Sequence, residues 1–365
     1  MQRIFQALNE AESLLTTGHL VCSKISWMGS SLHLESNCRA AAKDIFSYVT
    51  PYFHVENEHV DKSNYAIRFV NEARVPGFKS IVQTVENSGE EHKWFFGKTV
   101  PIIRAGDEFL VSLRDDLLVL VQKSAISMFS ESRSEAATKW AKRFIREYLV
   151  SRLVDGLRVH GGVAPIFDSG AVIIGANGAG KTSLMLHLLH ELGGNFCCND
   201  RAVLVETDGG VSGLGTPIQS QISAGSLAMF PGHPLALDML ESTQRGGIVK
   251  YSLSPREMTA LIGADITRQV TIGMVIVPNL SAATSIPPEI RPIPLEFRTG
   301  ILLGASLQKD PAFPAAALGF SEKQVPKRLV ERVIALPWYS IAGHYADRTL
   351  AKSLVDAVGA HRTEG

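Results

Sequence analysis

The residues with the clearest chemistry read Gly-Ala-Asn-Gly-Ala-Gly-Lys-Thr at positions 175–182. Their spacing, G-x-x-x-x-G-K-T, is that of a phosphate-binding loop. The glycines let the backbone curl until successive N–H groups point at phosphate oxygens, and a following helix adds the partial positive charge of its N-terminus. The apolar run 171–174 predicts a buried strand before the loop, and 183–192 predicts a helix after it. This is the context that such a loop requires.

The residues of the loop have distinct expected roles. Lys181 should reach the β- and γ-phosphates of ATP, and the Thr182 hydroxyl should ligate Mg²⁺. We therefore predict ATP and Mg²⁺ as the cofactors. The residues predicted to contact the nucleotide are Gly175, Asn177, Gly178, Ala179, Gly180, Lys181, Thr182 and Ser183.

Two large classes of phosphate-loop proteins do not fit the rest of the sequence. The loop looks like that of an ABC-type transporter ATPase, which also needs an LSGGQ-like signature and an apolar strand that ends in Asp-Glu. Residues 212–215 read Ser-Gly-Leu-Gly, and residues 277–279 read Val-Pro-Asn without acids. A GTPase needs an Asn-Lys-x-Asp motif to read guanine, and the sequence contains none. The sequence therefore disfavours both classes.

Two more chemical groups are predicted to approach the loop. Asp200 follows the apolar run 195–198, which predicts the next strand, and His160 precedes a predicted strand at 163–167. Because strand ends of open α/β sheets meet at the ligand crevice, we expect Asp200 to lie near Mg²⁺. The alternatives are an ordinary turn acid for Asp200 and a structural histidine for His160.

The order of these groups resembles HPr kinase/phosphorylase, in which a His-Gly pair, a phosphate loop and an Asp-Asp-Arg triplet follow with similar gaps. Here they are His160-Gly161, the loop, and Asn199-Asp200-Arg201. The likeness covers about residues 150–225 and is diffuse through Pro278 to the C-terminal helix. It implies an α/β fold with an HPr-kinase-like P-loop domain of the phosphoenolpyruvate-carboxykinase-related group. It also implies that Asp200 binds metal or transfers a proton, beside His160, with Lys181 as the third catalytic residue.

The chain departs from this family pattern in two places. Asn199 stands where the family has its first Asp, and an amide cannot accept a proton as a carboxylate does. Residues 213–217, Gly-Leu-Gly-Thr-Pro, occupy the region of the family's downstream glutamate motif without an acid. Reverse phosphorolysis and HPr as the substrate are therefore not expected.

Arginines are the side chains expected to stabilise charge on a transferring phosphoryl group. Arg201 is expected to pair with a carboxylate, with a phosphate contact as the alternative. Arg268, Arg291 and Arg298 include candidates for a transition-state contact, and a plain surface charge is the alternative for each.

The composition points to an ordinary cytoplasmic protein. Lys+Arg and Asp+Glu both number 36, so no overall field favours nucleic acid or an anionic membrane. The first ten residues lack the shape of a signal peptide, and no apolar run approaches the roughly 20 residues that span a bilayer. Four cysteines in 365 residues do not indicate a disulfide framework.

A chain of 365 residues predicts two domains at about 150 residues each. Residues 1–133 predict a smaller N-terminal α+β domain, 134–158 a linking helix that is apolar on two faces, and 159–365 the HPr-kinase-like ATP-binding domain. The predicted strands outside the loop region are 19–27, 65–70, 80–85, 108–113, 117–122, 202–206 and 269–277, and further helices are 39–49 and 346–358.

The favoured function is that of an ATP- and Mg²⁺-dependent kinase. It would transfer the γ-phosphoryl group to a hydroxyl of a small molecule or peptide, mainly by positioning and charge neutralisation. The alternative is a nucleotide-binding regulatory or interaction protein with weak ATPase activity, which Asn199 favours. The family's assemblies imply a homo-oligomer. No motif before the loop or after residue 225 identifies the acceptor.

Overall fold

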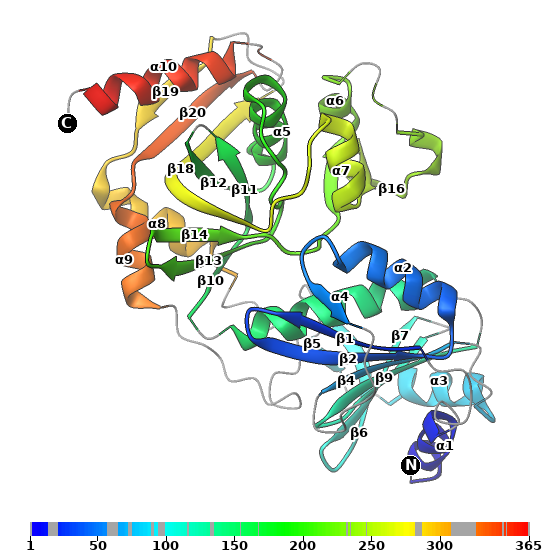
Figure 1. The fold of residues 1–365 in the computed structure, drawn as a ribbon. Helices are drawn as coiled ribbons and strands as arrows, with labels where there is room; N and C mark the ends of the chain where they lie inside the picture. The colour runs from blue at the N-terminus through cyan, green and yellow to red at the C-terminus, as the bar shows by residue number, and fades with distance from the viewer. Residues whose placement is uncertain are drawn as a thin grey trace. The chain divides into compact units, whose positions relative to one another are not determined.

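The computed structural model divides into two compact units, one within residues 1–154 and one within residues 155–308 and 324–365. Both units mix helices and strands (Figure 1), which confirms the α/β class. Among the described residues, no helix is both long and apolar enough to cross a membrane. The structure describes residues 2–13, 21–56, 65–71, 75–88, 91–93, 99–114, 117–131, 135–153, 155–166, 168–230, 233, 235–245, 247–281, 287–307, 326–344, 347 and 349–363.

The first unit is built on a nine-stranded sheet in the order β3-β1-β2-β4-β9-β8-β7-β6-β5. The β2–β4 and β4–β9 pairs are parallel, and the other pairs are antiparallel. The strands are β1 (Val21–Trp27), β2 (Ser30–Ser36), β3 (His54–Glu56), β4 (Ala66–Asn71), β5 (Glu91–Lys93), β6 (Thr99–Ala105), β7 (Glu108–Arg114), β8 (Leu117–Val121) and β9 (Ala125–Ser130).

Helices cover both faces of this sheet (Figure 1). Helices α1 (Gln2–Ser13) and α3 (Phe78–Glu86) share one apolar core with the sheet. Helix α2 (Arg39–Val49) agrees with the predicted helix at 39–49. It packs against α4 (Glu135–Arg152), which also contacts β2, β4 and β9.

The prediction of a strand at 80–85 was wrong, because these residues lie in α3. The buried side chains of α3 are Phe78, Ile81, Val82 and Val85, which follow the i, i+3, i+4, i+7 spacing of a helix face. The β-branched residues Ile81, Val82 and Val85 favour a strand by their propensity. The helical period of the four positions outweighs that propensity once they can pack on the sheet.

Helix α4 lies inside the first unit, since the boundary between the units falls at residue 154. The hydrophobic pattern of the sequence instead predicts boundaries at 133 and 158, with the helix as a linker. Ala137, Phe144, Ile145 and Leu149 are fully buried, so α4 supplies core to the first unit. The two apolar stripes are therefore the faces that a core helix presents to several neighbours in one unit.

The second unit carries an eight-stranded sheet, with the order β10-β13-β14-β18-β12-β11 and with β20 pairing both β18 and β19. Strands β12, β18 and β20 are parallel, and the remaining pairs are antiparallel. The strands are β10 (Leu157–Val159), β11 (Gly161–Ile166), β12 (Ser169–Ile174), β13 (Ala202–Thr207), β14 (Gly210–Leu214), β18 (Gln269–Ser281), β19 (Glu289–Pro292) and β20 (Trp338–His344).

Strand β18 runs through Pro278, whereas the sequence analysis ends it there. Strand β12 pairs with β18 only as far as Ile276. Pro278 therefore lies beyond the ladder with β12 and keeps its partner Ile341 in β20. A proline is tolerated in a strand where its missing N–H has no ladder partner to satisfy.

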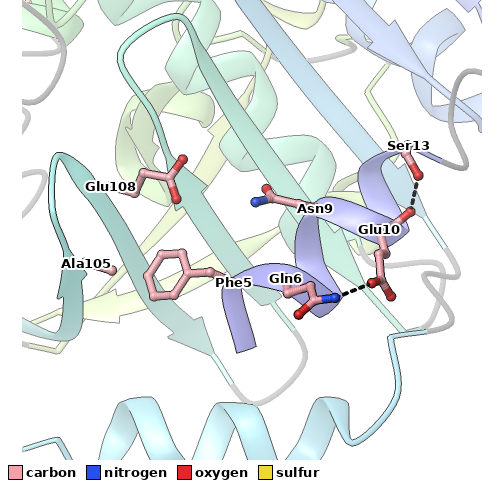
Figure 2. Close-up of a pocket in the computed structure, with 7 residues that line it drawn as sticks. All are labelled: Phe5, Gln6, Asn9, Glu10, Ser13, Ala105 and Glu108. Atoms are coloured by element: carbon pink, nitrogen blue, oxygen red, sulfur yellow. Dashed lines mark hydrogen bonds between the residues drawn. The ribbon is translucent and has the colours of Figure 1, made fainter. Parts of the chain in front are cut away.

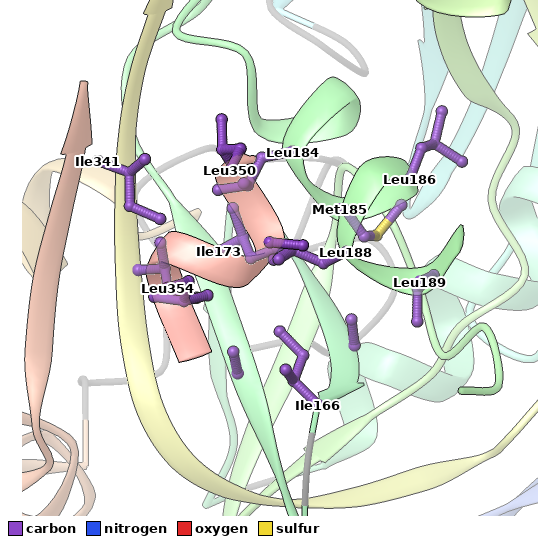
Figure 3. Close-up of a cluster of buried hydrophobic side chains, with 14 of the residues drawn as sticks. Ile166, Ile173, Leu184, Met185, Leu186, Leu188, Leu189, Ile341, Leu350 and Leu354 are labelled. Atoms are coloured by element: carbon purple, nitrogen blue, oxygen red, sulfur yellow. The ribbon is translucent and has the colours of Figure 1, made fainter. Parts of the chain in front are cut away.

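Two apolar cores hold helices against this sheet. Helix α5 (Lys181–Leu192) and helix α10 (Leu350–Thr363) share one core, in which Leu184 and Leu188 meet Leu350 and Leu354 (Figure 3). Helices α8 (Leu295–Ala305) and α9 (Lys327–Ala335) belong to the other core with Trp338. The contacts in this first core fix α5 in relation to β12, the strand that precedes it.

A small three-stranded sheet completes the second unit, in the order β15-β17-β16. Its buried residues Ile222 and Leu253 belong to the same core as α5. The elements are β15 (Ser220–Ser223), α6 (Ala224–Leu227), the 3₁₀ turn Leu237–Met239, β16 (Ser242–Arg245), β17 (Ile248–Leu253) and α7 (Pro255–Ile262).

Candidate functional site

The glycine-rich loop leaves β12 at Ile174 and enters α5 at Lys181, as the sequence predicts. Gly175, Gly178 and Gly180 have φ of 154°, 82° and 88°, which side chains rarely adopt. No side chain caps the N-terminus of α5. The first N–H groups of this helix are therefore directed into the loop without a side-chain acceptor, the arrangement that binds anions.

The loop is also anchored to the neighbouring strand. The N–H of Leu280 in β18 donates to the carbonyl of Ala179 at 3.0 Å. A Cβ placed on Gly180 would lie 2.8 Å from the Cβ of Leu280. Position 180 therefore requires glycine for two reasons, its positive φ and the close approach of β18.

We expect Gly180→Ala to destabilise the protein more than Gly178→Ala. Both positions have a left-handed φ, which costs about 1–2 kcal/mol for a residue with a Cβ. Only position 180 adds a steric overlap, because a Cβ on Gly178 meets nothing within 4 Å. Overpacking of this kind costs roughly a further 1–3 kcal/mol, which we expect for Gly180→Ala alone. Urea unfolding of the two variants measures the difference in their free energies of unfolding. Equal losses in the two variants would contradict the expected role of Leu280.

Lys181 lies in the curve of the loop. Its Nζ donates to the carbonyls of Gly175 at 2.9 Å and Ala176 at 3.0 Å. Burial lowers the pKa of Lys181; the Asp200 carboxylate opposes this shift, and the Lys250 ammonium adds to it. The ammonium is thus held at the mouth of the loop, with one acid and one further cation nearby.

Asn199 bonds directly to Thr182, the residue predicted to ligate the metal. The Thr182 hydroxyl donates to Oδ1 of Asn199 at 3.3 Å, and Nδ2 of Asn199 donates back to Oγ1 at 3.1 Å. Asn199 is only 2% exposed. The amide that replaces the family's first acid therefore orients the Thr182 hydroxyl, a contact that the sequence analysis missed.

His160 and Asp200 lie together beside the loop. The Nδ1 atom of His160 is 3.5 Å from Oδ1 of Asp200, and its Nε2 is 3.0 Å from Oδ1 of Asn177 within the loop. Burial lowers the pKa of His160, while the Asp200 carboxylate raises it and Lys181 lowers it further. Because Oδ1 of Asn177 and Oδ1 of Asp200 are both acceptors, each contact favours a proton on the ring nitrogen that faces it, and burial opposes the charge that two protons would bring.

Sheet register explains why these distant residues meet. Gly161 pairs with Ile174, so His160 lies at the edge where β12 enters the loop. Val163 bridges Cys198, which brings the 199–201 triplet toward the same edge. The predicted strand at 195–198 was wrong in its extent, because it makes only isolated bridges, at Phe196 and Cys198. The bridges at Phe196 and Cys198 are enough to direct residues 199–201 toward the loop.

The triplet itself forms a tight turn centred on Asp200. Asp200 has a positive φ of 68°, and the N–H of Arg201 donates to the carbonyl of Asn199 at 2.8 Å. Asp is one of the few residues that tolerate this backbone region. The turn leaves the Asp200 side chain 40% exposed while Asn199 points inward.

The arginines proposed as transition-state partners are used elsewhere. Arg298 donates to the carbonyls of Ile293, Ile334 and Leu336. Arg291 pairs with Glu289 and is 70% exposed. Arg268 precedes β18, and the loop contacts the other end of that 13-residue strand. The structure therefore brings none of these three to the loop.

The residues of the small sheet that approach the loop were not predicted. Ser183, directly after Thr182, has its Oγ 2.7 Å from Oγ of Ser226, which in turn is 2.9 Å from Oγ of Ser223. Ser223 is paired with Lys250 in β17. No sequence signal singles out Lys250, because it lies 69 positions after Lys181 in a run without a motif.

Oxygen ligands for a metal are few at this site. Among the described residues, no group of three or more His, Cys, Asp or Glu side chains could hold a metal ion. A hydroxyl at Thr182 and a carboxylate at Asp200 are hard oxygen donors, which suit Mg²⁺. Mg²⁺ usually keeps several waters and takes further ligands from the phosphates of a substrate. Two oxygen donors from the protein therefore suit Mg²⁺, which does not need a site made wholly of protein ligands.

A separate pocket of about 520 Å³ lies in the first unit (Figure 2). Both of its carboxylates have amide partners, since Gln6 donates to Glu10 at 2.9 Å and Gln122 donates to Glu108 at 2.8 Å. This pairing leaves no open cluster for a metal or phosphate. The pocket is lined by Phe5, Gln6, Asn9, Glu10, Ser13, Ala105 and Glu108.

The chain is similar in structure to 86 solved chains, among them a kinase/phosphatase. The solved structure of the Hpr(Ser) kinase/phosphatase from Coxiella burnetii covers 57% of this chain and 97% of its own chain, at 15% identity and a TM-score of 0.27. No protein-family model matches the sequence, and no curated protein matches it. Any assignment of function therefore depends on the geometry of the site.

Proposed function

We propose that this chain is an ATP- and Mg²⁺-dependent kinase that transfers the γ-phosphoryl group to a hydroxyl of a small molecule or peptide. The observation that carries the proposal is the meeting of His160 and Asp200 beside Lys181 and the uncapped N-terminus of α5. A phosphate-binding loop alone would account for nucleotide binding. A carboxylate and a half-buried imidazole next to it supply what transfer to a hydroxyl needs in addition.

Each residue has one task in the proposed reaction. The N–H groups of the loop and Lys181 bind the phosphates and neutralise their charge. Thr182 and Asp200 would hold Mg²⁺, which would supply positive charge to neutralise the phosphates. Asn199 keeps the Thr182 hydroxyl oriented through its paired hydrogen bonds. His160 and Asp200 are the groups at the site that can receive the proton of the acceptor hydroxyl.

The order of the motifs supports the same assignment, since it resembles the HPr kinase group. The departure from the family pattern at Asn199 narrows the proposed reaction. With Asn199 bonded to Thr182, Asp200 is the one acid of the triplet, and no second carboxylate stands beside it there. We therefore propose transfer in the forward direction, from ATP to an acceptor other than HPr.

A nucleotide-binding regulatory protein is the second candidate. The observation that favours it is the same amide at position 199, which removes one acid from the site. Such a protein would bind ATP through the same loop and release γ-phosphate to water slowly or not at all.

Tracing the γ-phosphate separates the two functions. The purified protein is incubated with γ-labelled ATP, Mg²⁺ and, in parallel, a metabolite extract and a protein extract of the source cells. Label on an organic acceptor is expected, and it should be absent with a Lys181→Ala control, which excludes contaminating kinases. Label recovered only as inorganic phosphate supports the regulatory function. Failure of the wild-type protein to bind ATP contradicts both.

A further inference from the structure

Phosphoryl transfer requires more positive charge around the γ-phosphate than one lysine supplies, because charge spreads over three equatorial oxygens in the transition state. Arg268, Arg291 and Arg298 lie elsewhere in the fold, at the far end of β18 or bonded to carbonyls and to Glu289. Arg201 of the triplet acts on His160 as a positive charge, and a further cation comes from another element, the small sheet. Among the described residues near the loop, Lys250 of β17 is the one that changes the pKa of Lys181 as a like charge.

The small sheet is held beside the loop by hydroxyl contacts. Ser183 lies in the first turn of α5, and its Oγ is 2.7 Å from Oγ of Ser226. Ser226 is 2.9 Å from Oγ of Ser223, and the N–H of Ser226 donates to that same hydroxyl at 3.1 Å. Ser223 is the register partner of Lys250. Lys250 is thus connected to the first turn of α5 through its strand partner Ser223 and two contacts between serine hydroxyls.

Lys250 has no acidic partner to account for its position. It is half-buried, and within the part of the chain that the structure describes no carboxylate forms an ion pair with it. Directly opposed residues of an antiparallel pair share a face of the sheet, so the Lys250 side chain lies on the face from which Ser223 contacts Ser226 beside α5. An anion bound between Lys250 and Lys181 would offset the repulsion of the two like charges.

We propose that Lys250 binds the γ-phosphate of the nucleotide as a second cation beside Lys181. This inference rests on the proposed kinase function and adds a residue from a different element to its site. In this proposal the N–H groups of the loop and of the first turn of α5 bind the α- and β-phosphates. Lys250 lies outside the loop, and so it is assigned to the terminal phosphate, which ATP has and ADP lacks.

The difference between ATP and ADP gives a direct test that does not depend on turnover. Isothermal titration with Mg²⁺ compares the β,γ-imido analogue of ATP with ADP, on wild-type protein and on Lys250→Met, which keeps the unbranched stem. We expect the variant to bind the ATP analogue about tenfold more weakly and ADP unchanged, since a hydrogen bond to a charged group is of this order. Lys250→Arg should restore most of the loss.

Lys327→Met is the matched control, because Lys327 is 91% exposed on α9 and carries the same charge. It should leave both affinities unchanged. A loss of affinity for ADP equal to that for the ATP analogue would overturn the proposal, because it would show a general field effect. So would unchanged nucleotide affinity with a raised KM for the acceptor, which would assign Lys250 to the acceptor. Wild-type protein that binds neither nucleotide would refute the kinase function itself.

Discussion

Lys181→Ala is expected to abolish phosphoryl transfer and to weaken ATP binding while the fold survives. The ammonium is the one cation within the loop itself, where it already bonds to two carbonyls at 2.9 and 3.0 Å. Its removal takes away both a phosphate ligand and the charge that opposes the developing charge in the transition state. A loss on the order of a thousandfold in turnover and about tenfold in ATP affinity is expected.

The fold should tolerate this change because Lys181 is the first residue of α5 and alanine is the best helix former. The side chain belongs to neither apolar core of the second unit. Circular dichroism and urea unfolding check the fold, and isothermal titration measures the affinity. Lys181→Arg is the informative companion, since it keeps the charge but not the compact ammonium that fits the loop. Unchanged ATP affinity in Lys181→Ala would contradict the predicted role.

Asp200→Asn is the second variant with a large expected effect. If Asp200 and Thr182 together hold Mg²⁺, the amide removes the one negative ligand that the protein supplies at this place. A loss of about two to three orders of magnitude in turnover is expected, since a preorganised charge at the reacting centre is worth this much. The backbone should be unaffected, because Asn tolerates the positive φ of 68° at this position as well as Asp does.

The measurement is turnover at saturating Mg²⁺, so that weaker metal binding alone cannot account for the loss. Asp208→Asn is the matched control, because Asp208 is an exposed acid in the turn after β13. A second measurement is the pKa of Lys181, which the Asp200 carboxylate raises and which should fall in the variant. Near-normal turnover would show that the catalytic carboxylate lies elsewhere and that Asp200 is a plain turn residue.

The sequence alone was sufficient for those features whose information is local. The loop, the strand before it and the helix after it were predicted within a few residues, because glycine spacing and hydrophobic period are properties of neighbouring positions. The helix at 39–49 was predicted for the same reason. Local reasoning failed at 80–85, where β-branched residues suggested a strand but their spacing matched a buried helix face. Propensity is weaker there than packing.

The composition of the site was decided by the tertiary structure. Sequence order placed His160 and Asp200 near the loop only through a general rule about strand ends, whereas the register of β11 with β12 and the bridge at Cys198 set their actual distance. The pairing of Asn199 with Thr182 and the approach of Lys250 had no signal in the sequence at all. Both depend on contacts between residues far apart in the chain, and only the folding of the sheets and α5 onto shared cores brings those residues together.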